Sequence, residues 1–77
     1  MTLKIISIED TLFDGEVTMV VLPGEAGEFT VLRNHAALVS TLVSGNVTYV
    51  ANGEQAQLPI NGGVVDVDNN IVSVCVY

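Results

Sequence analysis

The residues of this chain most able to do chemistry lie close together in the stretch PGEAGEFTVLRNHAALVS, Pro23 to Ser40. It contains the only histidine, His35, and one of the two basic side chains, Arg33, just after Glu25 and Glu28. Carboxylates near a histidine could supply a general acid and a general base. The stretch is therefore a candidate catalytic cluster, a candidate docking loop, or a turn between strands.

Each chemical interpretation has a requirement to meet. Catalysis needs a concave, partly desolvated pocket, for which a small domain filled by aliphatic side chains has little room. A metal site needs several converging ligands, whereas His35 and Cys75 are far apart in the sequence. We expect Cys75 to be a small hydrophobic residue in or near the core. We therefore expect no catalytic residue, cofactor or metal, and keep as the alternative a free-standing β-domain that binds a ligand or hydrolyses a substrate through Glu28, Arg33 and His35.

The length and the charge of the chain restrict its class. A chain of 77 residues forms one domain, here expected over residues 1–77, and a domain of this size buries only about 60% of its unfolded surface. The net charge of −7 repels phosphate backbones and anionic headgroups. We expect no nucleic-acid partner and no direct binding to lipid.

The cysteine count and the N-terminus indicate where the chain resides. Cys75 is the only cysteine, so no disulfide can form within the chain, which is typical of a reducing compartment. The sequence MTLKIISIED lacks the pattern of a signal peptide, and no stretch approaches the ~18 apolar residues of a spanning helix. These features favour a cytoplasmic chain that reaches a membrane only through another protein.

Short apolar runs separated by turn residues recur along the whole chain. Such a pattern, rich in Val, Ile and Leu, is typical of an antiparallel β-sandwich or barrel. The predicted strands are Leu3–Ile8, Val17–Leu22, Phe29–Leu32, Leu38–Val43, Val47–Ala51, Gln55–Leu58, Val64–Val67 and Ile71–Val76.

The residues between these runs predict specific turns. Asn52-Gly53 suits a type I′ hairpin turn, and Asp68, Asn69 and Asn70 suit a turn before the last strand. The segment FDGEV is expected to be a turn leading into a strand. The segment NHAALVSTLVS is compatible with a strand or with a short helical turn. The last strand is apolar on both faces apart from Ser73, which predicts that both faces are covered or are available to a partner.

Five blocks in a fixed order carry a resemblance to a known family. They are Phe13, Gly15 and Val17; Pro23, Gly24, Gly27, Glu28 and Phe29; Leu32, His35, Ala36 and Leu38; Gly45; and a final set of Gly62, Gly63, Val67, Asn70, Val72 and Val74. In this order the chain resembles the epsilon subunit of F-type ATP synthases, over the N-terminal sandwich of that subunit and across essentially all of the 77 residues.

The resemblance implies a fold and a role. The implied fold is a two-sheet antiparallel β-sandwich or flattened barrel of about ten short strands. The implied role is that of a non-catalytic rotor subunit, monomeric within the complex, that links the gamma subunit to the membrane c-ring. It would couple proton-driven rotation to ATP synthesis, as a peripheral part of the enzyme on the cytoplasmic face of the inner (plasma) membrane. By position, Glu28, Arg33, His35 and Ser40 would lie on the edge that meets the c-ring and gamma, where an acidic edge suits the Arg and Gln of c-ring loops.

The chain departs from the family pattern at several positions. Arg33-Asn34 replaces the Pro-Gly before the histidine; Asn34 can still adopt the left-handed conformation, while Arg33 adds a charge. Ala37 replaces a proline, and Thr30 replaces a glycine. Typical members continue into a two-helix domain that restrains ATP hydrolysis, whereas this sequence stops at Tyr77. As a complete chain it would resemble the short, sandwich-only epsilon subunits and lack that helical brake.

Overall fold

A computed structural model describes all 77 residues as an all-β fold. The strands are β1 (Thr2–Ile6), β2 (Thr11–Glu16), β3 (Met19–Gly24), β4 (Gly27–Leu32), β5 (Leu38–Leu42), β6 (Gly45–Ala51), β7 (Glu54–Ile60), β8 (Gly63–Asp68) and β9 (Ile71–Val76). The structure contains no helix long and apolar enough to cross a membrane.

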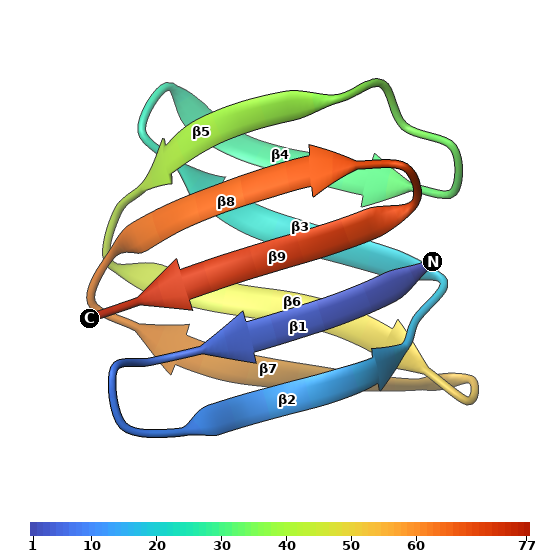
Figure 1. The fold of residues 1–77 in the computed structure, drawn as a ribbon, viewed down its shortest axis with the longest axis horizontal. Coiled ribbons are helices and arrows are strands. Elements are labelled where there is room, and N and C mark those ends of the chain that lie inside the picture. The colour runs from blue at the N-terminus through green and yellow to red at the C-terminus, as the bar shows by residue number, and fades with distance from the viewer.

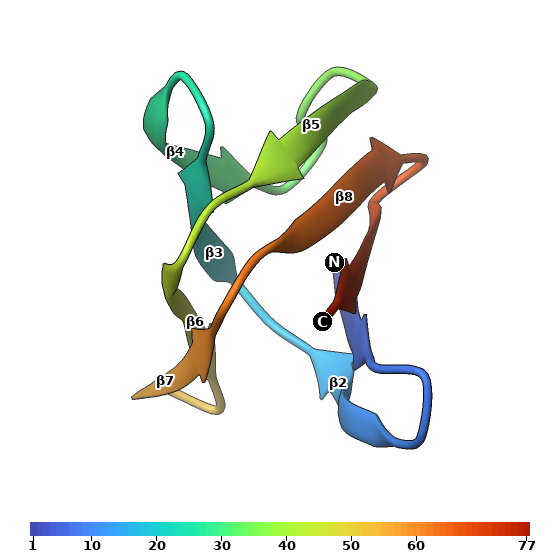
Figure 2. The same cartoon turned by 90° about the vertical axis from the view of Figure 1, so that its left-hand side faces the viewer.

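The strands form one hydrogen-bonded sheet that curls into two facing layers (Figures 1 and 2). The β8 layer has the order β2-β1-β9-β8-β5, and the β3 layer consists of β4, β3, β6 and β7. The layers join where β5 continues into β6, and Gly24 of β3 pairs there with Leu42 of β5. The predicted β-sandwich is confirmed, but its two layers are parts of one continuous hydrogen-bonded sheet rather than two separate sheets.

The sheet has nine strands, in agreement with the prediction of about ten. Two details differ from the predictions. The FDGEV segment is not a turn, because Phe13 to Glu16 belong to β2, which pairs with β1. One pairing is parallel, that of β1 with β9, because the two strands enter the sheet from the same end of the molecule. The NHAALVSTLVS segment, for which the sequence left a strand and a short helical turn open, forms an irregular loop and then the strand β5.

The core lies between the layers and consists of 14 buried aliphatic residues, with no buried polar side chain. Each strand turns alternate side chains inward, as β1 does with Leu3 and Ile5 on either side of the exposed Lys4. Full burial of each such side chain contributes about 1.5 to 3 kcal/mol. The sequence prediction that Val, Ile and Leu build the core is confirmed.

An aromatic pair extends this core between the layers. Phe13 of β2 and Tyr49 of β6 are half-buried, with ring centroids 4.3 Å apart and planes tilted by 43°. Tilted rings at this separation attract each other beyond the area that they bury. Phe13, a residue of the family pattern, therefore contributes packing rather than chemistry.

The asparagine turns have the predicted geometry. Asn52 and Gly53, between β6 and β7, have φ of 54° and 77°, and Asn69 and Asn70, between β8 and β9, have φ of 52° and 63°. Positive φ at both central residues is the type I′ pattern, whose twist matches that of the strands.

The outer side of β9 corrects one prediction. Val72 and Val74 are buried as expected, but Cys75 and Ile71 are exposed on the opposite face, and Cys75 is a free thiol. Strand alternation places Cys75 outward, because its neighbours Val74 and Val76 point inward. The expectation of Cys75 in or near the core was wrong, and in the monomer the outer face of β9 is not covered.

Candidate partner-binding edge

The residues selected from the sequence belong to β4, to β5 and to the loop between them. In Figures 1 and 2, β4 and β5 lie at the same side of the sandwich, one in each layer. β4 pairs only with β3, and β5 pairs with β8 and meets β3 at a single residue pair. We call β4, the loop of residues 33–37 and β5 together the β4–β5 edge. Its strands have free polar backbone groups, as edge strands do.

Glu28 lies at one end of this edge, next to the β3–β4 hairpin turn. It pairs with Pro23 in the ladder, and its side chain is exposed and forms no salt bridge. Glu25, in the turn itself, donates its backbone N–H to the carbonyl oxygen of Thr41 at 2.9 Å, which fixes the turn to β5. Two carboxylates are thereby presented to solvent from a well-anchored turn.

Gly24 is the residue that lets this turn pack closely. A Cβ at position 24 would lie 2.7 Å from the carbonyl oxygen of Gly27 and 2.8 Å from the ring of Phe29. Both distances are shorter than real Cβ contacts, so a side chain would displace the turn. The absence of a side chain at Gly24 thus allows the tight turn, and the turn determines the position of Glu28.

Arg33 and His35 lie at the other end of the edge, in the loop between β4 and β5. The backbone N–H of His35 donates to the carbonyl oxygen of Leu32 at 3.1 Å, which closes the turn. Its Nδ1 lies 2.8 Å from the carbonyl oxygen of Ala36. Because a carbonyl oxygen can only accept, this contact requires a hydrogen on Nδ1. Arg33 is exposed and forms no salt bridge.

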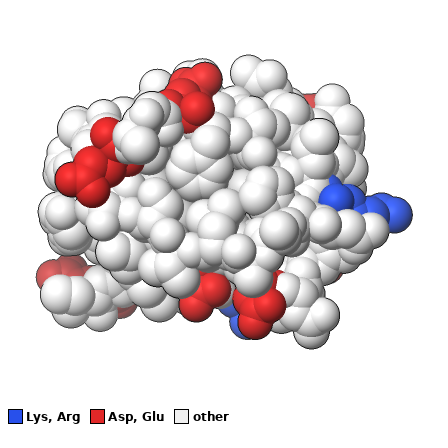
Figure 3. Space-filling model, turned by 90° about the horizontal axis from the view of Figure 1, so that it is seen from above, with Lys and Arg blue, Asp and Glu red and all other residues white.

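The edge is therefore charged differently at its two ends. Figure 3, which looks onto the molecule from above, shows carboxylates toward the left and along the lower margin, and a basic side chain that projects at the right. Glu28 and Arg33 are separated by the length of β4, about 17 Å at ~3.3 Å per residue. Glu28 is too far from Arg33 and His35 to share a substrate with them, so the structure does not bring together the three residues of the hydrolase alternative.

Ser40 belongs to the edge through β5, but its side chain is half-buried. Its Oγ donates to the carbonyl oxygen of Thr41 at 3.2 Å. The neighbouring Val39 points to the opposite side and is 76% exposed. Of the four residues selected from the sequence, three are on the surface and Ser40 is partly covered.

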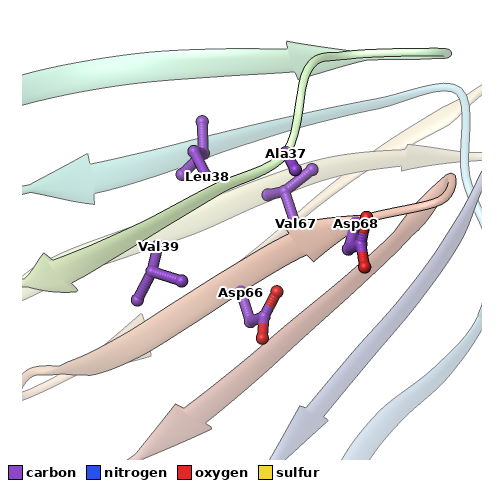
Figure 4. Close-up of a pocket in the computed structure, with 6 residues that line it drawn as sticks. All are labelled: Ala37, Leu38, Val39, Asp66, Val67 and Asp68. Carbon is purple, nitrogen blue, oxygen red and sulfur yellow. The ribbon is translucent and has the colours of Figure 1, made fainter.

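No hollow of the surface resembles an enclosed binding site. One open hollow of about 280 Å³ lies between β5 and β8, lined by Ala37, Leu38, Val39, Asp66, Val67 and Asp68 (Figure 4). Asp66 and Asp68 point outward from β8 there, and neither forms a salt bridge. No three of the His, Cys, Asp and Glu side chains converge as metal ligands.

Within the β8 layer, sequence reasoning singled out the outer face of β9 but not the outward side chains of the other strands. Exposed apolar residues occur on its β5, β8, β9 and β1 strands: Val39, Val64, Ile71 and Ile6. The strand alternation contained this signal, because three of these residues follow or precede a buried residue of their strand: Ile5, Val65 and Val72. The signal was weak because several of these strands are apolar at most positions.

One carboxylate outside the edge has a perturbed acidity. The hydroxyl of Thr2 donates to Glu16 at 2.8 Å, and the N-terminal ammonium of Met1 lies 3.2 Å from the same carboxylate. The hydrogen bond from Thr2, followed by the bond and charge of the ammonium, lowers the pKa of Glu16 from its ordinary value. This cluster links β1 to β2. Arg33 lines the same shallow hollow as Met1 and Glu16, and its positive charge adds a smaller lowering of the pKa of Glu16.

Comparison with known proteins places the chain in a family. The family described as the beta-sandwich domain of the ATP synthase delta/epsilon chain matches residues 1–77. The ATP synthase epsilon chain of Desulfitobacterium hafniense is 38% identical over 73 residues, which cover 95% of this chain and 55% of that protein. That of Xanthomonas euvesicatoria is 41% identical over 73 residues, covering 94% and 52%. The chain belongs to the delta/epsilon chain family of ATP synthases, through its β-sandwich domain, and spans about half the length of these relatives.

Solved structures share the fold. A chain of the Euglena gracilis mitochondrial ATP synthase superposes with a TM-score of 0.89 at 23% identity, over 96% of this chain and 48% of that one. A chain from the central stalk and c-ring structure of the Tetrahymena thermophila enzyme superposes with a TM-score of 0.80 at 14% identity, over 97% and 61%. At these identities the likeness establishes the architecture of the layers.

Proposed function

We propose that this chain is a non-catalytic rotor subunit of an F-type ATP synthase, and that it links the gamma subunit to the membrane c-ring. The observation that carries the proposal is the match of the family's sandwich domain to all residues from 1 to 77. The relatives at 38% and 41% identity are ATP synthase epsilon chains.

The β4–β5 edge is the proposed contact with the c-ring and gamma. Glu28, Arg33 and His35 are exposed on it, and Ser40 completes the set on β5. Glu28 and Glu25 form no salt bridge within the chain, so both carboxylates are free to meet basic and amide side chains of a partner. The net charge of −7 favours such a partner in the diffusional encounter as well.

The fold suits a part that transmits torque without doing chemistry. A continuous ladder connects all nine strands, so that a force applied at one edge passes through backbone hydrogen bonds and the packed core. In this role the chain turns with gamma, one copy per enzyme, as a peripheral component on the cytoplasmic face of the inner (plasma) membrane. ATP is made by other subunits, and no cofactor is required.

The test is reconstitution. Inverted membrane vesicles are prepared with the cognate ATP synthase depleted of its epsilon subunit, and the 77-residue chain is added back. We expect ATP-driven proton pumping to recover toward the level of the untreated enzyme. Pumping that stays at the depleted level, with a chain shown to be folded by circular dichroism, would overturn the proposal.

A further inference from the structure

The loop that carries Arg33 and His35 is attached to the β8–β9 turn by a reciprocal pair of amides. The backbone N–H of Asn34 donates to Oδ1 of Asn70 at 2.8 Å, and Nδ2 of Asn70 donates to Oδ1 of Asn34 at 3.2 Å. The two residues are 36 positions apart in the sequence. We call these two hydrogen bonds the Asn34–Asn70 clamp.

The clamp provides the only hydrogen bonds that reach from the loop to another part of the chain. The other hydrogen bonds of residues 33–37 are local, from the His35 N–H to Leu32 and between the His35 ring and Ala36. All five residues of the loop are exposed, so little packing holds it. Without the clamp, the loop would be restrained only where it joins β4 and β5.

Asparagine suits positions 34 and 70 for two reasons, the backbone conformation and the reciprocal hydrogen bonding. Asn34 and Asn70 have φ of 62° and 63°, in the left-handed region that asparagine tolerates better than other side-chain-bearing residues. An amide side chain also offers both a donor and an acceptor, which a reciprocal pair requires. Arg33-Asn34 is the point where this chain departs from the Pro-Gly of the family pattern, and the amide contact supplies a restraint that a glycine side chain cannot.

We propose that Asn34 and Asn70 are positioning residues, which hold Arg33 and His35 in a binding-ready arrangement before a partner arrives. The inference rests on the proposed function, since it needs the β4–β5 edge to bind the rotor. A loop that is already ordered loses less conformational freedom on binding, and this increases affinity without any new contact.

The test compares Asn70→Gly with the matched control Asn69→Gly. Both residues lie in the same turn with positive φ, and glycine adopts that region without strain, so both variants keep the turn. Only Asn70 is hydrogen-bonded to the loop through its side chain. In the free chain, hydrogen exchange measured by NMR is expected to be about 5- to 10-fold faster at the Asn34 amide in Asn70→Gly and unchanged in Asn69→Gly.

Binding to the epsilon-depleted ATP synthase provides the second measurement. We expect Asn70→Gly to bind about 3- to 10-fold more weakly than the wild-type chain, while its melting temperature stays within about 2 °C of that of Asn69→Gly. Equal affinities of the two variants, or an Asn34 amide that exchanges equally fast in both, would overturn the proposal that the Asn34–Asn70 clamp positions the loop. A wild-type chain that does not bind at all would instead overturn the proposed function, so the two failures are distinguishable.

Discussion

At the scale of single residues, Glu16 is the carboxylate whose ionisation is coupled to folding. Thr2 and the N-terminal ammonium stabilise its charged form and lower its pKa in the native state. The unfolded chain therefore holds this proton more tightly. The stability contributed by the Glu16 carboxylate is present above its unfolded-state pKa and is lost as the pH falls through the lowered native pKa.

The Glu16 prediction is tested with Thr2→Val, which removes the hydroxyl donor. We expect the pKa of Glu16 to rise toward its ordinary value, as measured by NMR titration of the side-chain carboxyl carbon. Thr11→Val is the control, because Thr11 lies at the other end of β2, the strand of Glu16, and forms no hydrogen bond to that carboxylate. A Glu16 titration that Thr2→Val leaves unchanged would show that the hydroxyl does not set the acidity.

Gly63 is the residue at which a single methyl group should cost the most stability. It has φ of 158°, and a Cβ there would overlap the backbone carbonyl of Cys75 on β9. We expect Gly63→Ala to lower the free energy of unfolding by about 3 kcal/mol or more, because the β8–β9 ladder must shift. Urea denaturation measures this loss.

Gly53→Ala is the matched control for Gly63. Gly53 also has a positive φ, of 77°, but no atom lies within 4 Å of a Cβ built there. In Gly53→Ala the only expected cost is the strain of the left-handed backbone, about 1 to 2 kcal/mol. Similar losses in the two variants would mean that the close approach of β8 and β9 at Gly63 is not the cause.

At the scale of elements, the contact between β2 and β6 through Phe13 and Tyr49 connects the layers outside the aliphatic core. Phe13→Ala should destabilise the fold by about 2 to 4 kcal/mol, because it removes a ring packed between the layers. Leu12→Ala, at the adjacent position whose side chain is 43% exposed, should cost less than about 1 kcal/mol. Thermal unfolding of both variants measures the difference, and equal losses would show that β2 does not pack through Phe13.

The elements that sequence reasoning predicted correctly are those with strong local signals. The turns at Asn52-Gly53 and Asn69-Asn70 were predicted to have positive φ, and they do. The alternation in β9 predicted that Val72 and Val74 are buried, and both are. β2 was missed because Asp14 and Gly15 suggest a turn, whereas pairing with β1 keeps this segment extended. The parallel pairing of β1 with β9 depends on the global topology, which no local pattern encodes.

At the scale of the whole molecule, the candidate site could be predicted only in part. The sequence singled out Glu28, Arg33 and His35, and the structure exposes all three on one edge. Their placement at opposite ends of β4 depends on that segment being a full strand, so residues close in the sequence are far apart in space. The Asn34–Asn70 clamp could not be predicted, because it joins two turns that only the folded topology brings together.

The charge of the β4–β5 edge leads to a prediction about assembly. Glu28→Lys should weaken binding to the epsilon-depleted enzyme about tenfold or more, if Glu28 meets a partner in a desolvated contact. A solvent-exposed contact would be worth only about 0 to 1 kcal/mol. Glu54→Lys makes the same charge change at the start of β7, away from the edge, and should bind as the wild type does. Equal binding of the two variants, measured by biolayer interferometry, would mean that Glu28 is only a turn residue.

Native mass spectrometry of the cognate ATP synthase tests the central claim most directly. The enzyme is depleted of its epsilon subunit, mixed with the 77-residue chain and weighed intact, then dissociated to identify the subunits that stay with the chain. The account predicts a mass gain of one chain per enzyme, and a subcomplex in which the chain remains with gamma and the c-ring. An enzyme that gains no mass, or that binds the chain without gamma and the c-ring, would contradict it.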